Sequence, residues 1–300
     1  YSCLICKDYN PKGEGKACEF DENNNITMET KNYRVEVEPS EYTLNQGEDF
    51  TLPYGKAYYT KDGVESLVSD TVVGNPKMID TNKIGETTVV YVYKGARAEL
   101  KITVVDNVNP SVPQVVLRLD NKKGKLYSGG WHNGNIYAEY KSTDYSKKGI
   151  LGSGIKEYQL KQEGGSFNTL TANNYTHTTN GETIYEVRSI DKSANISEAN
   201  TYKVMIDKEK PTCELTVSGT KGNDPWYTST ATISFNDEKT TDTISGLKTK
   251  TIDSPTIKGS VKNKKITGKV TDKAGNTTRC YKTVSVDTIN PKVNYSVSGG

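Results

Sequence analysis

Histidine is nearly absent from this sequence: 300 residues include two, His132 and His177. Neither lies beside a Ser or Cys in a nucleophile signature such as G-x-S-x-G, and the sequence has no H-E-x-x-H, P-loop or G-x-G-x-x-G motif. No pair of acidic residues is marked by its spacing as two carboxylates facing one cleft. We therefore expect no catalytic residues, no cofactor and a protein that is not an enzyme.

An excess of charge of one sign is also missing. The 39 Lys and Arg residues against 37 Asp and Glu residues leave a formal net charge of +2. Such a balance gives no field that would attract a polyanion or an anionic lipid surface. We expect no nucleic acid among the partners.

Long apolar runs are missing as well, and this bears on membranes and on the size of the cores. No stretch of about 18 apolar residues occurs, so we expect no membrane span in this sequence. Counting Gly and leaving out Tyr, about 35% of the residues are apolar, against a usual 45 to 50%. The low net charge and the many Tyr, Val, Ile and Thr residues favour ordered strands over disorder. The composition therefore predicts small β-domains with thin cores.

The five cysteines divide into a distant pair and an N-terminal group. Cys213 has the strand parity of Leu215, and Cys280 has that of Val284, so both side chains should face one core. Their wide separation favours a disulfide in an oxidising compartment over a metal site, with two buried thiols as the alternative. We predict a Cys213–Cys280 disulfide.

The N-terminal group has the spacing C-x2-C-x11-C, formed by Cys3, Cys6 and Cys18. Structural zinc needs four ligands, and the nearest histidine in the sequence, His132, is more than 100 residues away. We therefore predict a second disulfide within this group, with one cysteine left over, and no metal.

An internal repeat organises the rest of the sequence. The frame Asp-x3-Pro recurs at 106–110, 207–211 and 287–291, with steps of 101 and 80 residues, each suited to one β-sandwich. Ser153-Gly154-Ile155 corresponds to Ser245-Gly246-Leu247, and the segment 191–195 corresponds to 272–276.

Apolar residues between these landmarks alternate with polar ones, as in 98–104, 202–206 and 231–235. A period of two places one face of a strand in a core and the other in water, and we expect antiparallel strands and no helices. Segment 272–276 predicts a hairpin turn with Gly275 in the left-handed conformation, while Ala194 at the matching position predicts a strained or different turn.

The Asp-x3-Pro frame, the Ser-Gly element and the Asp-Lys-Ala-Gly-Asn turn resemble bacterial immunoglobulin-like tandem repeats of Gram-positive surface and secreted proteins. The resemblance implies an all-β fold of tandem immunoglobulin-like β-sandwiches in an elongated array. We expect the following division: a Cys-containing N-terminal segment 1–31, sandwiches at 32–108, 109–208 and 209–288, the last with the disulfide, and the start of a further repeat at 289–300. Because the sequence starts at Tyr1, we expect a fragment of a longer protein, monomeric as a fragment.

Asp106, Asp207 and Asp287 occupy positions at which cadherin-like proteins bind calcium between domains. Lys208 and Lys210 beside Asp207 argue against a calcium site there, which needs six to eight oxygen ligands. We favour the simpler interpretation that Asp ends a strand and Pro stops its continuation, and predict no metal site.

Exposed aromatic side chains are the remaining candidates for ligand contacts, namely Trp131, Trp226 and Tyr227. Packing on half-exposed sheets also explains such residues, and we favour that interpretation. An internal Lys–Asn isopeptide bond, known from Gram-positive surface domains, also stays open.

The resemblance implies a non-catalytic stalk, display and adhesion module of an extracellular protein, on a bacterial cell surface or secreted, with a host, matrix or glycan ligand. The alternative is an accessory carbohydrate-binding region of a secreted polysaccharide-degrading enzyme. The fold itself serves many functions, so the site must decide between them.

Overall fold

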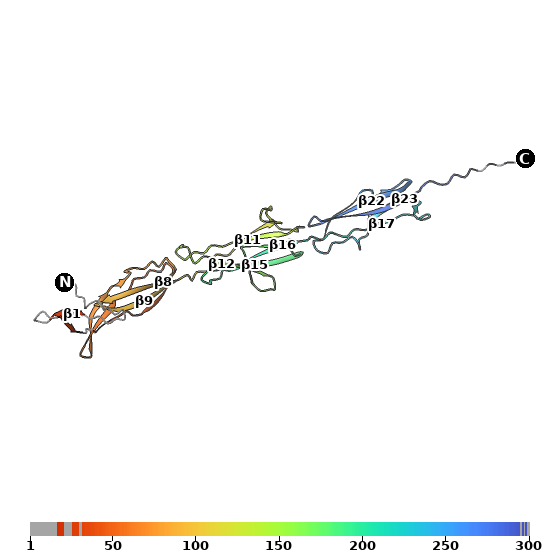
Figure 1. Cartoon of the computed structure of the whole chain (residues 1–300). Helices are drawn as coiled ribbons and strands as arrows, with labels where there is room; N and C mark the ends of the chain where they lie inside the picture. Colours follow the sequence, from red (N-terminus) through yellow and green to blue (C-terminus); the bar gives the residue numbers. More distant parts are fainter. Residues whose placement is uncertain (1–16, 21–25, 30–31, 295, 297, 299–300) are drawn as a thin grey trace. The chain divides into compact units, whose positions relative to one another are not determined.

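The computed structural model describes residues 17–20, 26–29, 32–294, 296 and 298, and among them it contains strands and no helix (Figure 1). Strands β1 (Ala17–Phe20) and β2 (Ile26–Glu29) form an antiparallel pair. The other strands form three- and four-stranded sheets that pack in pairs around three separate hydrophobic cores. The predicted all-β class and its β-sandwiches are confirmed.

The first sandwich packs a three-stranded sheet, β3-β5-β6, on a four-stranded sheet, β4-β9-β8-β7. Its core contains Leu100, Ile102 and Tyr91, all fully buried. The strands are β3 (Asn32–Glu36), β4 (Glu41–Asn45), β5 (Gly55–Lys61), β6 (Val64–Val72), β7 (Gly74–Asn75), β8 (Gly85–Tyr93) and β9 (Ala96–Val105).

The second sandwich has the same division into sheets of three and four strands, β10-β11-β14 and β13-β12-β15-β16. Ile136, Val187 and Ile206 are fully buried in its core. The strands are β10 (Gln114–Leu119), β11 (Ile136–Lys141), β12 (Ile155–Gln162), β13 (Asn168–Thr169), β14 (Asn174–His177), β15 (Gly181–Asp191) and β16 (Asn200–Ile206).

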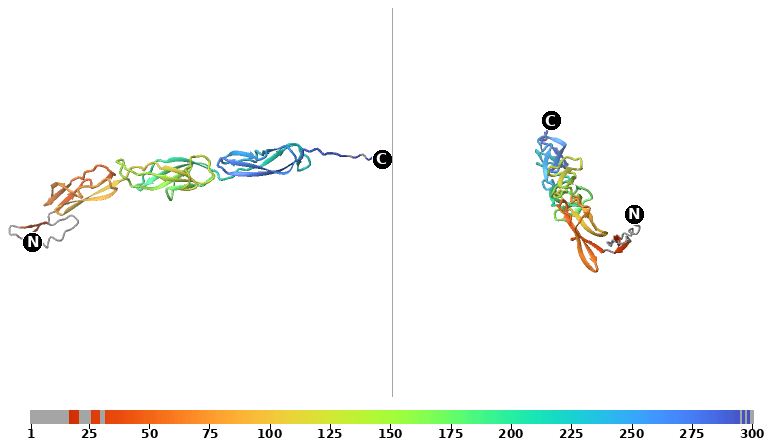
Figure 2. Two further views of the ribbon diagram at one scale, coloured as in Figure 1. Left: turned by 90° about the horizontal axis from the view of Figure 1, so that it is seen from above. Right: turned by 90° about the vertical axis from the view of Figure 1, so that its left-hand side faces the viewer.

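The third sandwich pairs the sheets β17-β19-β21 and β18-β23-β22-β20 around Leu215, Ile266 and Val286. Figure 2 shows each of the three sandwiches in its own colours, ending in blue for this one. The strands are β17 (Leu215–Ser218), β18 (Trp226–Tyr227), β19 (Ala231–Phe235), β20 (Leu247–Ile252), β21 (Thr256–Ile257), β22 (Val261–Asp272) and β23 (Thr277–Val286).

The alternation of the sequence explains which residues enter these cores. In β9, Leu100, Ile102 and Val104 are buried while the residues between them remain at least partly exposed. Val204 and Ile206 of β16 follow the same rule. These strands therefore bury one face only, which keeps the cores thin.

Two pairings differ from the expected antiparallel arrangement. β4 pairs parallel with β9 from Glu41↔Lys101 to Asn45↔Val105, and β18 pairs parallel with β23. In both cases an early strand of the sandwich lies beside its last strand, and the chain between them passes through the other sheet. Such a crossover connection allows the two strands to run in the same direction, which a hairpin does not.

The turns at 191–195 and 272–276 have the same hydrogen bonds. The main-chain N–H of Asp191 donates to Asn195 O, and that of Asp272 to Asn276 O, both at 3.1 Å. The φ angle is 98° at Gly275 and 70° at Ala194. Of the two expectations for Ala194, the structure shows the strained one, because alanine is held in the left-handed conformation.

Cys3 and Cys6 lie outside the described residues, and of Cys18 only the main chain in β1 is described. The predicted second disulfide therefore stays a prediction, as do the exact domain bounds. Proximity of Cα atoms groups the described residues up to Val112 with Ser142–Glu157 and Ser189–Glu198, and groups the others in a second unit. Each site described below lies within one of these units.

Candidate functional site

Two groups of three aspartates occur at matching places of the repeat. In each group, one carboxylate oxygen from every residue lies within 4.8 Å of the others. The first triad is Asp106, Asp144 and Asp191, and the second triad is Asp207, Asp242 and Asp272.

Three different segments bring the first triad together. Asp106 directly follows β9, Asp144 lies in the loop after β11, and Asp191 is the last residue of β15. The triad therefore forms only when the chain is folded, since its members are separated by 38 and 47 positions in the sequence.

The Ser-Gly element of the repeat supplies N–H donors to two of the carboxylates. Ser153 N donates to Asp106 Oδ2 at 2.8 Å, and Gly154 N donates to Asp144 Oδ2 at 2.7 Å. The N–H of Val108 donates to the other oxygen of Asp106 at 3.1 Å. These bonds fix the orientation of both carboxylates.

The turn at 191–195 orients the third carboxylate and links it to the first. Asn195 donates its main-chain N–H to Asp191 Oδ1 and its side-chain amide to Asp191 Oδ2, both at 2.8 Å. The same amide also donates to the carbonyl oxygen of Asp106 at 3.1 Å. The Asn of this turn is therefore a positioning residue of the triad.

The second triad repeats this arrangement. Ser245 N donates to Asp207 Oδ2 at 3.2 Å, and Gly246 N donates to Asp242 Oδ1 at 2.6 Å. Asn276 Nδ2 donates to the carbonyl oxygen of Asp207 at 2.8 Å. The landmarks that define the repeat in the sequence thus build the same carboxylate group twice.

The charge of the first triad is not balanced by a basic side chain. Asp106, Asp144 and Asp191 are 5%, 3% and 0% exposed, and no ion pair within 4.0 Å among the described residues includes them. Two such charges about 5 Å apart repel by roughly 3 kcal/mol at an effective dielectric constant of 20. A triad with all three groups ionised therefore requires a compensating positive charge.

The pKa values reflect this crowding. Burial raises the pKa of Asp144, and the neighbouring Asp106 and Asp191 charges raise it further. Burial opposes ionisation of Asp106 as well, but the N–H donors of Ser153 and Val108 outweigh it and lower its pKa. The triad thus holds at least one carboxylate strongly as an anion.

Both triads offer oxygen ligands only. Carboxylates without His or Cys suit hard cations such as Ca²⁺ or Mg²⁺ better than zinc. The sequence pointed to Asp106 and Asp207 but did not identify Asp144 or Asp242. The ammonium group of Lys208, which neighbours Asp207 in the sequence, donates to the carbonyl oxygen of Thr178 at 2.6 Å.

The third repeated aspartate has a different environment. Asp287 Oδ1 accepts hydrogen bonds from Ser260 Oγ at 3.3 Å and from Ile289 N at 3.0 Å. Within the described part of the chain it belongs to no group of three acids. The interpretation of this residue as a strand end fits these contacts.

Cys213 and Cys280 form a disulfide with a Cα–Cα distance of 5.5 Å. Cys213 lies just before β17 in one sheet, and Cys280 lies in β23 of the other. The bond therefore joins the two sheets of the third sandwich.

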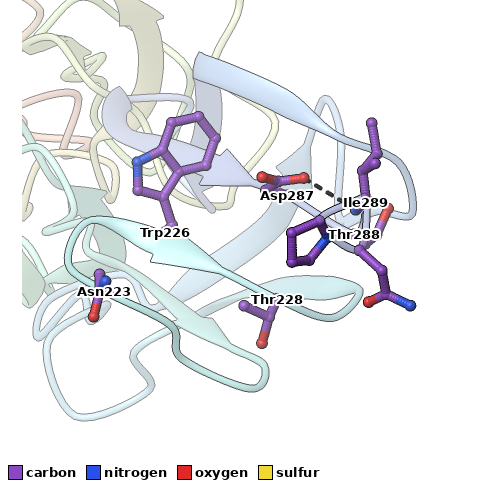
Figure 3. Close-up of a pocket in the computed structure, with 8 residues that line it drawn as sticks. Asn223, Trp226, Thr228, Asp287, Thr288 and Ile289 are labelled. Atoms are coloured by element: carbon purple, nitrogen blue, oxygen red, sulfur yellow. Dashed lines mark hydrogen bonds between the residues drawn. The ribbon is translucent and has the colours of Figure 1, made fainter. Parts of the chain in front are cut away.

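Trp226 lines a cavity of about 390 Å³ in the third sandwich (Figure 3). Asn223, Thr228 and Asp287 add polar atoms around it. Tyr227, the neighbouring candidate, packs against the hydrophobic core instead. Of these two predicted aromatics, Trp226 lines this space and Tyr227 does not.

Trp131 lines a smaller cavity of about 130 Å³ together with Tyr127 and His132. His132 Nε2 lies 3.0 Å from Asp120 Oδ1 at the surface. The hydrogen-bond partner of His132 is Asp120 and that of His177 is Tyr202, and neither is a Ser or Cys.

No protein-family model matches the chain, and no curated protein matches it. Among solved structures, it is similar to the fibronectin(III)-like modules of Clostridium thermocellum CbhA, with 14% identity, a TM-score of 0.23, and 58% of this chain and 94% of that chain covered. It is also similar to a structure from a 1.5-MDa bacterial ice-binding adhesin (13% identity, TM-score 0.30, 86% and 98% covered). A tetra-tandem repeat in the extending region of a large adhesion protein gives 10% identity, a TM-score of 0.26, and coverage of 91% and 81%. TM-scores this low do not assign the fold. The assignment rests on the sheets and cores described above.

Proposed function

We propose that this chain is a non-catalytic run of immunoglobulin-like domains, 32–108, 109–208 and 209–288, that serves as a stalk, display and adhesion module of a bacterial extracellular protein. The observation that carries the proposal is the separation into three hydrophobic cores, each enclosed by its own pair of sheets. Small independent sandwiches add length while each one folds by itself.

One further observation supports an extracellular role of this kind. The Cys213–Cys280 disulfide suits an oxidising compartment. No helix of a length and apolarity that would cross a membrane occurs among the described residues.

Calorimetry and a binding screen test this function. The full chain should unfold in more than one transition, and beads coated with it should bind to a matrix or host-cell surface without any turnover of that surface. A single cooperative transition for the whole chain, or hydrolysis of a surface polymer, would contradict the proposal.

The cavity beside Trp226 favours one second candidate, a carbohydrate-binding role. An indole next to amide, hydroxyl and carboxylate groups is a combination that can stack on a sugar ring and bond its hydroxyls. Affinity electrophoresis in polysaccharide gels should then show retardation that Trp226→Ala abolishes and Trp131→Ala leaves intact. Equal migration of all three proteins in every polysaccharide would exclude this role.

A further inference from the structure

We propose that Asp106, Asp144 and Asp191 bind one calcium ion. The role is independent of adhesion, because it rests on the chemistry of buried side chains within one unit of the chain.

The first argument is an excess of hydrogen-bond acceptors in a buried region. Asp144 is 3% exposed, and its Oδ1 atom has no hydrogen-bond donor. Like Asp106 Oδ2, this oxygen lies within 2.8 Å of the position that a Cβ atom of Gly152 would occupy. Buried polar atoms without a partner are rare in native proteins, and a bound ion or water is one way in which such an atom is satisfied. A metal ion satisfies such an oxygen without needing a donor.

A second buried oxygen in this region also lacks a donor. Gln46 is 9% exposed, and its Oε1 atom has no partner. Its Nε2 donates to the carbonyl oxygen of Leu151 at 2.8 Å, and its main-chain N–H donates to Val105 O, directly before Asp106. Gln46 is thus bonded to the residues directly before Gly152 and Asp106, and its Oε1 is a second buried acceptor without a donor.

The backbone leaves room for the carboxylates to converge. A Cβ atom at Gly152 would lie 2.7 Å from both oxygens of Asp144 and 2.8 Å from Asp106 Oδ2. Any side chain at this position would displace the two carboxylates, so glycine permits their close approach. The N–H donors of Ser153 and Gly154 then hold them in place.

Calcium is the cation that these ligands favour. Three carboxylates can each bind through one or two oxygens, and calcium accepts six to eight oxygens in irregular geometry, whereas magnesium requires a near-ideal octahedron. No ammonium group in the described part of the chain balances the charge of the triad. Lys192 Nζ is nearby, 3.7 Å from the position that a Cβ atom of Gly154 would occupy, but it forms no ion pair with the three carboxylates. A divalent cation would compensate the negative charge of the carboxylates that this lysine does not neutralise.

The second triad provides the matched comparison. Asp242 is partly exposed, and none of the carboxylate oxygens of this triad is a buried atom without a partner. Water can hydrate Asp242, so the demand for a cation is weaker than in the first triad.

The test is isothermal titration of calcium chloride into the full chain after removal of metals with a chelator. We expect the unsubstituted protein to bind calcium, Asp144→Asn to weaken one equivalent by roughly a hundredfold, and Asp242→Asn to leave that equivalent unchanged. Magnesium chloride at the same concentrations should give little heat. Absence of calcium binding, or loss of the tight equivalent in Asp242→Asn alone, would overturn the proposal.

A measurement on the unsubstituted protein keeps the test independent of folding defects in the variants. The amides of Ser153 and Gly154 donate to the proposed ligands, so calcium should slow their hydrogen exchange by tenfold or more relative to the chelated protein. The reason is that a bound ion stabilises the closed state against the local opening through which these amides exchange. Slowing confined to other segments, or none at all, would contradict a site at the first triad.

Discussion

At the scale of single residues, Ala194 and Gly275 occupy one place in two copies of the same turn, with φ of 70° and 98°. The left-handed conformation costs an alanine about 1 to 2 kcal/mol, because Cβ approaches the following carbonyl oxygen, whereas glycine adopts it freely. Comparing the two positions therefore isolates the backbone strain of alanine in the left-handed conformation, because the turns are otherwise equivalent.

We predict that Ala194→Gly stabilises the second sandwich by up to about 1 kcal/mol and that Gly275→Ala destabilises the third by about 1 kcal/mol. Urea unfolding followed by fluorescence separates the two, because Trp131 lies in the second sandwich and Trp226 in the third. Shifts of the same sign in both variants would show that φ does not decide the effect.

His177 gives a second prediction at this scale. Its ring centroid lies 4.2 Å from that of Tyr185, and its Nε2 lies 3.0 Å from the hydroxyl of Tyr202. Burial lowers the pKa of His177 from 6.5 to about 4. Between these two values the unfolded chain binds a proton that the folded chain does not, so stability falls as the pH decreases through this window.

The expected loss between pH 7.5 and pH 4 is on the order of 3 kcal/mol. The urea midpoint of the Trp131 signal should decrease accordingly. His177→Phe removes the titrating ring from the tyrosine cluster and should flatten this decrease. An equally steep pH dependence in the variant would assign it to other groups.

At the scale of strands and turns, a disulfide joins the segment before β17 to β23 and constrains the third sandwich covalently. Cys213 and Cys280 are 67 positions apart, and closing a loop of this length stabilises the folded state by about 4 kcal/mol in the chain-entropy model. We predict a loss of that size on reduction.

The measurement is urea unfolding of the Cys213→Ala, Cys280→Ala double variant, or of the reduced protein. The Trp226 transition should move to a lower urea concentration while the Trp131 transition stays in place. If both transitions moved together, the sandwiches would not be separate cooperative units.

Much of this architecture can be predicted from patterns that recur at fixed spacing. The alternation of 98–104 and 202–206 identified buried strand faces, and the two copies of the Asp-to-Asn turn identified equivalent hairpins. Alternation reports which face is buried but not the direction of a neighbouring strand, so the parallel pairing of β4 with β9 could not be inferred from it.

The candidate site was only partly predictable for a related reason. Asp144 lies nine residues before Ser153, whereas Asp242 lies three before Ser245, so no constant spacing links these acids to the Ser-Gly element. The shared signal is a Thr-Asp pair, Thr143-Asp144 and Thr241-Asp242. Two residues are too few to recognise without the folded chain.

At the scale of the whole chain, the positions of the domain bounds affect stability. Asn276 of the third sandwich bonds the carbonyl oxygen of Asp207, and Ser245 donates to its carboxylate. A fragment that begins at residue 209 lacks Asp207 and therefore lacks both hydrogen bonds.

We predict that a fragment 207–288 folds and is more stable than a fragment 209–288 by about 1 to 3 kcal/mol, the amount expected for hydrogen bonds to a buried charged residue. Urea unfolding of the two fragments, both oxidised, measures the difference. Equal midpoints would show that Asp207 contributes nothing to the third sandwich, and an unfolded 207–288 fragment would contradict its independence.

The disulfide also determines how the third sandwich responds to mechanical tension. A force pulling on the chain before Cys213 and after Cys280 passes directly through the sulfur–sulfur bond, so the loop between the two cysteines carries no load. Unravelling this sandwich would otherwise release a contour length of about 230 Å, at roughly 3.4 Å per residue. Under tension, the first and second sandwiches would then unfold and lengthen, while the oxidised third sandwich would extend only by its few residues outside the disulfide. Reduction of the disulfide would allow the third sandwich to unfold and extend as well.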